Sequence, residues 1–414
     1  MTNQNGGNRV RGCDVCGSAA SDQLYRQEFR TFDDQSGLTG YRVVACARCG
    51  FLYADGIPAQ HVFDSYYRDM SKYEPAEDAS SMAPGMRRNY ELIVSEISQR
   101  LPDRNIRILD VGSASGDLLS IFREHGYANL TGLDPSPRCA EVAMRRHGLR
   151  VVTAPISEMH LSGERFDLIL LAGVLEHLRD LLPTLRSLET LLAPGGYFWF
   201  GIPDAGRFPE WVESPFQHFS LEHINFFTVE SLKNLMAAGG QQLVSCWETT
   251  HRLGAMNEPI INALFKKTDV VESCTRDRGG IEAARRYIAA SAELERRLFA
   301  VLDDSVPSGE QIVIWGTGSL TMHLLADERM KTLDVAAFVD LNQNYWGKTI
   351  GGIPLIPPAA MHARAEAILL ASYAYEAEMR DQIRDVYGLP NPVIPLFERV
   401  RLRGDAGSNR TVDR

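Results

Sequence analysis

This 414-residue chain lacks long apolar runs and any concentration of positive charge. No apolar stretch approaches the ~18 residues that a membrane helix needs, so we expect no membrane partner. The N-terminus also lacks the apolar core of a secretory signal peptide, which favours a cytoplasmic location. The formal net charge is −10, and no basic cluster offers a surface for phosphate backbones. We therefore expect a small-molecule substrate and no nucleic-acid partner.

Cysteine is scarce, but four of the seven cysteines form two Cys-x-x-Cys motifs, Cys13/Cys16 and Cys46/Cys49. Two such motifs fit tetrahedral coordination of Zn²⁺ by thiolates, each motif supplying two ligands from a tight turn. Four cysteine ligands leave no position for water, so the predicted zinc site is structural. A redox pair is the alternative interpretation.

The strongest ligand-binding pattern begins with the apolar residues 106–111, which predict a buried strand. Gly112 and Gly116 bracket a tight turn, and an amphipathic helix follows. The next predicted strand ends on Asp134, and an acid at that position can accept both hydroxyls of a ribose. This order predicts a Rossmann-like nucleotide-binding unit.

Two further motifs follow Asp134 along the chain. They are the strand start Phe166-Asp167 and the turn Leu192-x-Pro194-Gly195-Gly196. With Asp110-x-Gly112-x-x-x-Gly116 and Asp134, they resemble the class I S-adenosylmethionine-dependent methyltransferases. The resemblance implies S-adenosylmethionine as the cofactor, the adenine edge near residues 154–156, and the transferred methyl near the exit of the fourth strand. The implied cofactor-binding residues are Asp110, Gly112, Ser113, Gly116, Asp134, Pro135, Pro155, Ile156, Leu171 and Ala172.

Residues 214–227 form a second informative stretch, because His218, Glu222 and His223 lie there among aromatic residues. A histidine titrates near neutral pH, and a neighbouring carboxylate can orient it for proton transfer. His223, oriented by Glu222, is the favoured base, while His177 follows the fourth strand in a Leu-Glu-His sequence. Histidines that only cap or pack are the alternative.

Residues 306–405 begin a second α/β pattern, with the turn Gly316-Thr-Gly318 and a strand that ends on Asp340. Thr321 stands where the third glycine of the dinucleotide fingerprint belongs, so a Rossmann-like scaffold is favoured over an NAD(P) site. The expected α/β chain thus comprises a zinc-binding module (1–75), a Rossmann-like methyltransferase domain (76–250), a helical connector (251–305), a smaller Rossmann-like domain (306–405) and a disordered tail (406–414).

These parts in this order resemble the nucleotide-sugar C-methyltransferases of deoxysugar biosynthesis. The resemblance implies that His223, oriented by Glu222, removes a proton beside a sugar carbonyl, and that His177 donates a hydrogen bond to the enolate oxygen. Two positions depart from the family: Ser220 replaces a tyrosine and Gly173 replaces an asparagine. Methylation of oxygen or nitrogen on another metabolite is therefore the alternative. The sequence leaves open the acceptor, its nucleotide and whether the protein is a monomer or a homodimer.

Overall fold

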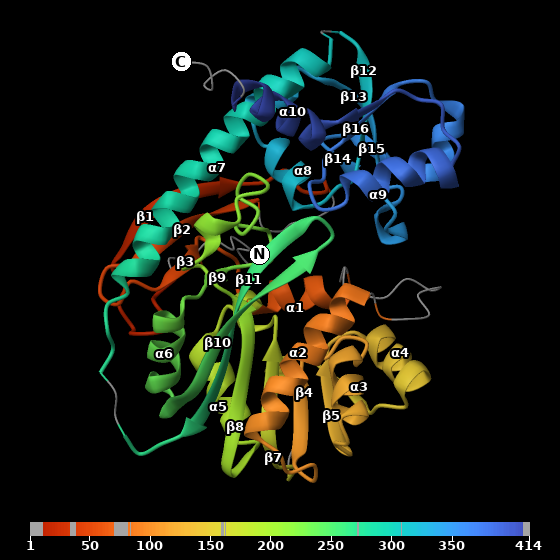
Figure 1. Cartoon of the computed structure of the whole chain (residues 1–414). Coiled ribbons are helices and arrows are strands. Elements are labelled where there is room, and N and C mark those ends of the chain that lie inside the picture. The colour runs from red at the N-terminus through yellow and green to blue at the C-terminus, as the bar shows by residue number, and fades with distance from the viewer. Residues whose placement is uncertain are drawn as a thin grey trace, which may run out of the picture.

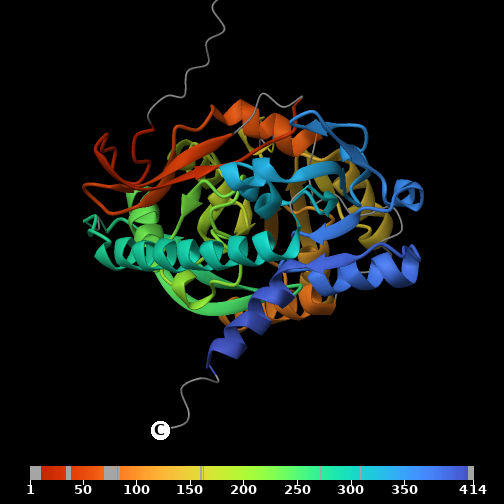
Figure 2. The ribbon, with the colours of Figure 1, turned by 90° about the horizontal axis from the view of Figure 1, so that it is seen from above.

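Three β-sheets organise the protein, and two views of the ribbon show how they are arranged (Figures 1 and 2). The structure is a computed structural model, and it describes residues 11–33, 39–69, 82, 84–158, 161, 163–270, 273–307 and 309–408. The predicted α/β class, with a Rossmann-like methyltransferase fold at its centre, is confirmed. No helix in these ranges is long and apolar enough to span a bilayer.

The N-terminal sheet contains one strand from a distant part of the sequence. Strands β1 (Ser21–Glu28), β2 (Gly40–Cys46) and β3 (Leu52–Asp55) pair antiparallel, and helix α1 (Gln60–Asp69) follows. The fourth strand, β9 (Asn225–Phe226), comes from the stretch that holds the candidate base and pairs with β3. The N-terminal sheet is therefore completed by a strand from the stretch that holds His223.

The central sheet has seven strands in the order β10-β11-β8-β7-β4-β5-β6. All neighbours pair in parallel except β11, which is antiparallel to both β8 and β10. The strands are β4 (Arg107–Val111), β5 (Asn129–Asp134), β6 (Val151–Thr153), β7 (Phe166–Ala172), β8 (Leu192–Pro203), β10 (Gln241–Leu253) and β11 (Met256–Lys267).

Alternate residues of the central strands pack on opposite faces of this sheet. Ile108, Leu168 and Leu170 contact helices α2 and α3, whereas Leu109 and Ile169 contact α5 and α6. Both faces are covered, which explains the near-continuous apolar strands. The helices are α2 (Pro84–Arg100), α3 (Asp117–Glu124), α4 (Pro137–His147), α5 (Leu181–Glu189) and α6 (Val229–Ala238).

The expected helical connector over residues 251–305 needs correction. The hairpin β10–β11 occupies its first part and lengthens the central sheet beyond residue 250. The apolar run in β11 fits a buried strand as well as a helix, and its pairing with β8 decides between them. Only α7 (Arg278–Ser305) is the predicted helix, and it runs from the N-terminal sheet towards the C-terminal unit (Figure 1).

The C-terminal sheet has six strands in the order β14-β15-β13-β12-β16-β17. It contains the strand before the turn at Gly316 and the predicted strand that leads to Asp340. Its strands are β12 (Gln311–Trp315), β13 (Asp334–Val339), β14 (Thr349–Ile350), β15 (Ile353–Ile356), β16 (Ala367–Leu370) and β17 (Val393–Pro395). Its helices are α8 (Ser319–Leu324), α9 (Glu376–Asp381) and α10 (Leu396–Ser408). Helix α10 continues into the segment expected to be a disordered tail, of which residues 409–414 lie outside the described ranges.

The parts of the chain share their hydrophobic cores. One buried cluster joins Phe29 and Val43 of the N-terminal sheet to Tyr287 of α7 and to Ile312 and Phe338 of the C-terminal unit. Shorter helical turns lie between these elements: η1 (Ile156–Glu158), η2 (Leu175–His177), η3 (Phe208–Glu210), η4 (Glu328–Thr332), η5 (Gln343–Tyr345), η6 (Pro358–Ala363) and the π-helical turn η7 (Gln382–Val386). Burial of the apolar cluster that includes Phe29, Tyr287 and Phe338 holds the N-terminal sheet, α7 and the C-terminal unit together.

Candidate active site

The glycine loop after β4 is clamped against the end of β5. The backbone N–H groups of Gly112 and Ser113 donate to the Leu133 carbonyl at 2.8 and 3.1 Å. Asp134 accepts from the Ala114 N–H at 2.8 Å and from the Ser136 N–H at 2.9 Å. Asp134 therefore fixes the shape of the loop, in addition to any contact that it makes with a ribose.

A side chain at Gly112 would fill the loop. Its φ is +72°, and a Cβ atom there would lie 2.8 Å from Val174 Cγ2. Gly116 has a φ of +76° and packs against Ala143 and Leu149 rather than facing the cavity. The first glycine thus keeps the ligand space open, and the second permits close packing of α3 on α4.

The predicted cofactor residues divide into two groups. Those that line the large cavity are Gly112, Asp134, Pro135, Pro155, Ile156 and Ala172. Those that lie behind it are Asp110, Ser113, Gly116 and Leu171. Burial and the negative charge of Asp134 raise the pKa of the Asp110 carboxyl to about 8. The residues of the second group therefore pack in the protein interior behind the cavity wall.

One cavity of about 970 Å³ is lined by residues of the N-terminal, central and C-terminal parts of the chain. Its walls include the cofactor loop, Tyr90 and Asn89 of α2, Gln27 of β1, and the turn at Gly316. The residues 214–220 and the tip of the β10–β11 hairpin complete it. A cavity of this size holds a cofactor and a second small molecule.

The turn η2 and residues 220–225 form one hydrogen-bonded unit in the wall of this cavity. The Ile224 N–H donates to the Glu176 carbonyl at 2.8 Å, and Asn225 Nδ2 donates to the carbonyls of Leu175 and Leu178 at 2.8 and 2.7 Å. The histidine candidates are therefore held by two segments that are fixed to each other.

Ser220, which stands in place of the family's tyrosine, supports this unit. Its hydroxyl accepts from the backbone N–H of Glu222 and of His223 at 3.3 and 3.2 Å. Its carbonyl accepts from the Tyr41 hydroxyl at 2.8 Å. In this position Ser220 shapes the turn that carries His223 into the cavity.

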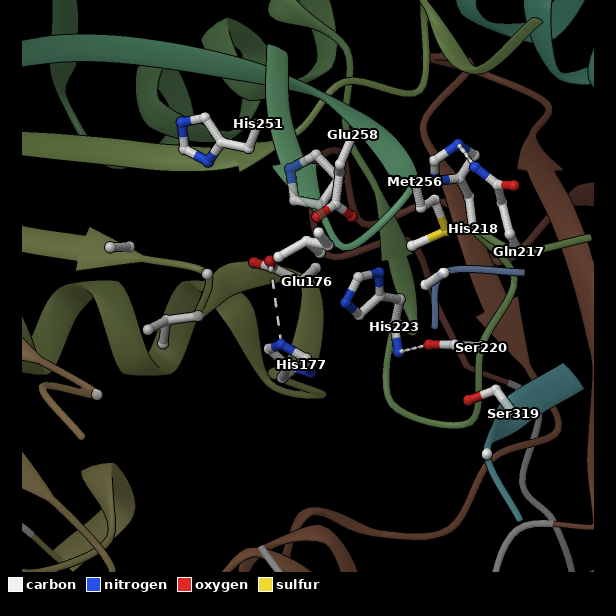
Figure 3. A pocket seen from close by; sticks show the side chains of 18 of the residues that line it. Glu176, His177, Gln217, His218, Ser220, His223, His251, Met256, Glu258 and Ser319 are labelled. Atoms are coloured by element: carbon white, nitrogen blue, oxygen red, sulfur yellow. Dashed lines mark hydrogen bonds and ion pairs between the residues drawn. The ribbon is translucent and has the colours of Figure 1, made fainter. Parts of the chain in front are cut away.

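Glu176, His177 and His223 face a common space (Figure 3). The Glu176 Oε1 atom lies 3.9 Å from His177 Nε2, and the two imidazole rings meet edge to face with their centroids 4.9 Å apart. The Glu176 side chain is buried, and burial together with the negative charge of Glu258 raises its pKa to about 8. This carboxyl was not assigned from the sequence, although it directly precedes His177.

The structure brings His177 and His223 together as predicted, but Glu222 contributes through its backbone. The Glu222 carbonyl lies 3.1 Å from His177 Nδ1, and its side chain is not among those that line the cavity. A carbonyl oxygen only accepts, so His177 carries its proton on Nδ1. The other nitrogen, Nε2, points toward Glu176.

Two further histidines line the cavity in apolar surroundings. His218 stacks on Phe208 with centroids 4.0 Å apart, and burial lowers its pKa to about 3. His251 lies on β10, and burial lowers its pKa to about 4. Both are neutral near pH 7. His251 and Glu258 were missed from the sequence because their hairpin was assigned to a helix.

The charge of the cavity wall is negative. Among the residues described, its ionised side chains are carboxylates, and no lysine or arginine lines it. The ionised residues are Asp64, Asp134, Glu258 and Asp340, whereas the raised pKa of Glu176, about 8, leaves that carboxyl largely protonated near pH 7. Such a wall favours a cationic ligand group, such as a sulfonium, over an anionic one.

In the C-terminal unit, Asp340 accepts hydrogen bonds from the neighbouring glycine turn. The Thr317 N–H and hydroxyl donate to Asp340 Oδ2 at 2.9 and 2.7 Å. Thr321, in the position of the missing glycine, donates from its hydroxyl to the Gly316 carbonyl at 2.7 Å. These bonds stabilise the turn without a dinucleotide.

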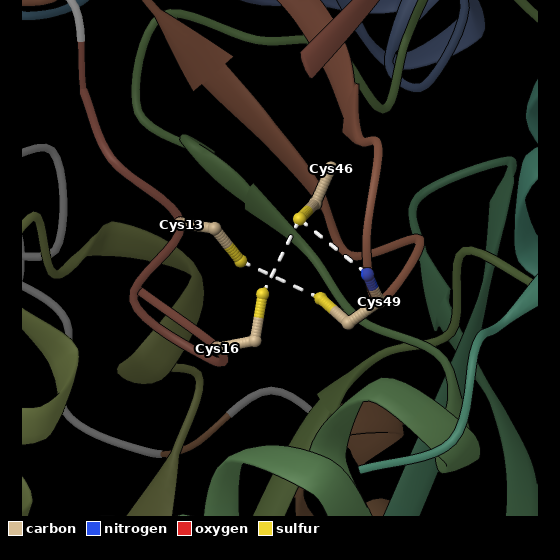
Figure 4. A group of neighbouring side chains, drawn as sticks. All are labelled: Cys13, Cys16, Cys46 and Cys49. Carbon is tan, nitrogen blue, oxygen red and sulfur yellow. Dashed lines mark hydrogen bonds between the residues drawn. The ribbon is translucent and has the colours of Figure 1, made fainter. Parts of the chain in front are cut away.

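The four predicted zinc ligands lie together where β2 ends and the turn to β3 begins (Figure 4). The sulfur atoms of Cys13 and Cys49 are 3.5 Å apart, and those of Cys16 and Cys46 are 3.4 Å apart. Tetrahedral Zn²⁺ with Zn–S bonds of ~2.3 Å separates its sulfurs by ~3.8 Å. The cysteine cluster therefore has the composition and nearly the spacing that a metal ion needs.

Comparison with known proteins agrees with this geometry. Residues 82–246 match the family described as Methyltransferase domain, and residues 308–393 match a family described as C2185-like, N-terminal. With the glycine loop and the sheet order, this match defines a class I methyltransferase. The protein is an S-adenosylmethionine-dependent methyltransferase.

Its relatives include a C-methyltransferase of similar length. The chain is 25% identical over 402 residues to the C-methyltransferase NovU of Streptomyces niveus, which covers 90% of this chain and 92% of that protein. The predicted resemblance to C-methyltransferases is thereby confirmed. A ubiquinone biosynthesis O-methyltransferase of Methylocella silvestris is 40% identical over 101 residues, but this covers only 23% of this chain and 39% of the relative.

Solved structures match about half of the chain. The 1,6-didemethyltoxoflavin-N1-methyltransferase of Burkholderia thailandensis, with S-adenosylhomocysteine bound, has 24% sequence identity and a TM-score of 0.40, covering 54% of this chain and 97% of that chain. Magnesium protoporphyrin IX methyltransferase from Synechocystis has 10% identity and a TM-score of 0.39, covering 51% and 100%.

Proposed function

We propose that this enzyme transfers a methyl group from S-adenosylmethionine to a carbon atom of a nucleotide-linked ketosugar. The observation that carries the proposal is the single cavity, which runs from the cofactor loop past His177 and His223 to the turn at Gly316. It has room for a cofactor and an acceptor at once. The similarity to a C-methyltransferase over 90% of the chain supports the same reaction.

In this proposal S-adenosylmethionine supplies the methyl group when it is bound. The loop at Gly112 and Asp134 holds the cofactor. His223 removes the proton from the carbon next to the acceptor's carbonyl, and His177 lies beside the carbonyl oxygen. The negative wall favours binding of the sulfonium. The enolate and the sulfonium, held in contact, lose their opposite charges together as the methyl group is transferred. The Cys₄ cluster holds Zn²⁺, which has a structural role only.

A second candidate is methylation of oxygen or nitrogen on an uncharged or amine-bearing metabolite. It is favoured by one observation, the absence of lysine and arginine from the described cavity wall. A nucleoside diphosphate normally finds arginine, lysine or a helix N-terminus at its phosphates. Here its phosphates would depend on backbone N–H groups.

Incubation with methyl-¹³C S-adenosylmethionine separates the two candidates. The acceptors would be nucleotide-linked ketosugars and matched sugars without the nucleotide, with the products read by carbon NMR. A labelled methyl on carbon of a nucleotide-linked sugar is the expected result. A labelled methyl on oxygen or nitrogen, or transfer only to acceptors without phosphate, would replace the first proposal by the second.

His223→Ala tests the catalytic cluster within the same assay. The variant should keep its affinity for S-adenosylhomocysteine, because His223 lies outside the cofactor loop, and lose turnover by at least ~10²-fold. Turnover equal to that of the wild type would remove His223 from the mechanism.

A further inference from the structure

Beyond the roles of the two histidines, we infer that Glu176 is a neutral carboxylic acid that donates a hydrogen bond to the carbonyl oxygen of the acceptor. Glu176 lines the large cavity from the turn η2, and its carboxyl faces the same space as His177 and His223 (Figure 3). The inference rests on the proposed function, because the acceptor's carbonyl belongs to that reaction. His223 remains the base.

The surroundings of Glu176 disfavour a negative charge. The residue is 3% exposed, and its Oε2 atom has no hydrogen-bond partner in the described structure. Among the residues described, no lysine or arginine lines the cavity. A carboxylate removed from water without donors or a cation is strongly destabilised, and protonation removes most of that cost.

A second buried acid shows how this chain accommodates a carboxylate elsewhere. Asp55 is 2% exposed, and its two oxygens accept from the Arg11 N–H at 2.7 Å and from the Arg42 guanidinium at 2.5 Å. Each oxygen of Asp55 therefore has a donor, and one of these donors is a cation. The Oε2 atom of Glu176 has neither, so the two sites suit opposite protonation states.

The charged and titratable groups around Glu176 favour the same state. Burial, together with the negative charge of Glu258 on β11, raises the pKa of the Glu176 carboxyl to about 8. The other titratable groups that face it are His177 on its own turn and His223 on the 214–227 stretch. His251 on β10 lines the same cavity, and burial lowers its pKa to about 4. At pH 7 the Glu176 carboxyl therefore keeps an O–H group that can donate.

Glu176 lies between the cofactor loop and the two histidines. The turn η2 follows β7 closely, and Val174 just before the turn lies against Gly112 of the loop. Gly173 has no side chain, and a Cβ atom there would lie 3.7 Å from Glu176 Oε1. The same Oε1 atom lies 3.9 Å from His177 Nε2. An acceptor carbonyl beside His177, as the proposed reaction requires, is therefore within reach of the Glu176 carboxyl.

The proton on Glu176 stays there throughout the reaction. His223 removes the proton from carbon, the C–H electron pair forms the double bond of the enolate, and the carbonyl pair moves onto oxygen. The hydrogen bond from Glu176 strengthens as this oxygen becomes negative, which stabilises the transition state. The enolate carbon then takes the methyl group, the carbonyl re-forms, and the electron pair of the methyl–sulfur bond stays on sulfur. His223 finally gives its proton to water.

Two substitutions at Glu176 distinguish a neutral donor from a carboxylate. Glu176→Gln keeps an N–H donor of similar size that cannot ionise, and we expect its turnover to stay within ~10-fold of the wild type. Glu176→Leu has no donor and should lose kcat by at least ~10²-fold with little change in KM. Both variants should bind S-adenosylhomocysteine, which serves as the control for folding.

The pH profile of kcat gives a readout that a merely structural role would not change. In the wild type, kcat should fall as the pH rises through about 8, because ionisation of Glu176 removes the donor. Glu176→Gln should lose this fall, whereas the surface variant Glu164→Gln should keep it, since Glu164 lies outside the cavity and pairs with Arg150. A Gln variant as slow as the Leu variant, a Leu variant as fast as the wild type, or an unchanged alkaline fall in Glu176→Gln would each overturn the inference.

Infrared difference spectroscopy tests the protonation state without an acceptor. The spectrum of the wild type minus that of Glu176→Gln, each with S-adenosylhomocysteine bound, should show the C=O band of a protonated carboxyl at pH 7 and lose it as the pH rises through about 8. Absence of the band at pH 7 would overturn the inference, whichever acceptor the enzyme uses. The band together with methylation of oxygen or nitrogen only would overturn the proposed function and the carbonyl contact, and would leave the neutral carboxyl supported.

Discussion

For His218, the structure predicts both the direction and the size of a change in folding stability with pH. The ring is buried against Phe208, and its backbone N–H donates to the Tyr287 hydroxyl at 2.9 Å. Burial lowers the pKa of His218 from 6.5 to about 3. We expect His218→Phe to keep the stacked packing and to remove the protonation equilibrium.

The sign follows from the lowered pKa in the folded state. The unfolded chain binds the proton more tightly, so acid favours unfolding. The contribution of His218 to stability is fully present above pH ~6.5 and is lost as the pH falls towards about 3. With these two pKa values, the free energy of unfolding falls by about 2 kcal/mol between pH 7 and pH 5 through this one group.

The assay compares urea midpoints of the wild type and His218→Phe at pH 7, 6 and 5. The variant loses the contact between the His218 ring and Gln217 Nε2 (3.2 Å), which costs about 1 kcal/mol at every pH. The difference between the two proteins should then shift by about 2 kcal/mol in favour of the variant on acidification. His251 is common to both and cancels. A pH-independent difference would refute the argument, and loss of turnover would point to a catalytic His218 instead.

Three further variants test other parts of the structure. Gly112→Val should weaken binding of S-adenosylhomocysteine by more than ~10²-fold in calorimetry, because its side chain meets Val174 and requires a positive φ; unchanged affinity would remove the loop from the cofactor site. Cys13→Ser should lower the zinc content per chain and the thermal midpoint, and a zinc-loaded variant of normal stability would contradict the Cys₄ site. Asp277→Ala should cost about 1–3 kcal/mol in denaturant unfolding, because this buried carboxylate accepts from the Thr228 hydroxyl and the Gly280 N–H. A loss below ~0.5 kcal/mol, the level of an ordinary surface change, would refute that role.

Local patterns allowed much of the fold to be predicted. The apolar strand before Gly112, the acid at Asp134 and the turn at Gly316 each depend on residues close in sequence, and the structure has a strand, a turn and a helix there. The two cysteine motifs could also be recognised from sequence, because each Cys-x-x-Cys spacing predicts two neighbouring candidate metal ligands.

Features that depend on distant pairing were missed. The apolar pattern of residues 256–267 fits a buried helix as well as a buried strand. Only their pairing with β8 makes them a strand. Glu176 follows a common Leu-Glu-His pattern, and its proximity to His223 arises from the bond between the Ile224 N–H and the Glu176 carbonyl. Tertiary contacts of this kind leave no local signal in one sequence.

The strand β9 has a consequence for recombining enzymes of this class. It belongs to the N-terminal sheet through its pairing with β3, and the same segment is tied to η2. Arg11 adds bonds to the carbonyls of Ile224 and Arg179, and the Asp277 N–H donates to the Cys49 carbonyl. A chimera cut at the boundary between the N-terminal and central parts would separate partners that shape the acceptor site. A segment exchanged intact is therefore discontinuous, and it includes the N-terminal sheet together with β9 and η2.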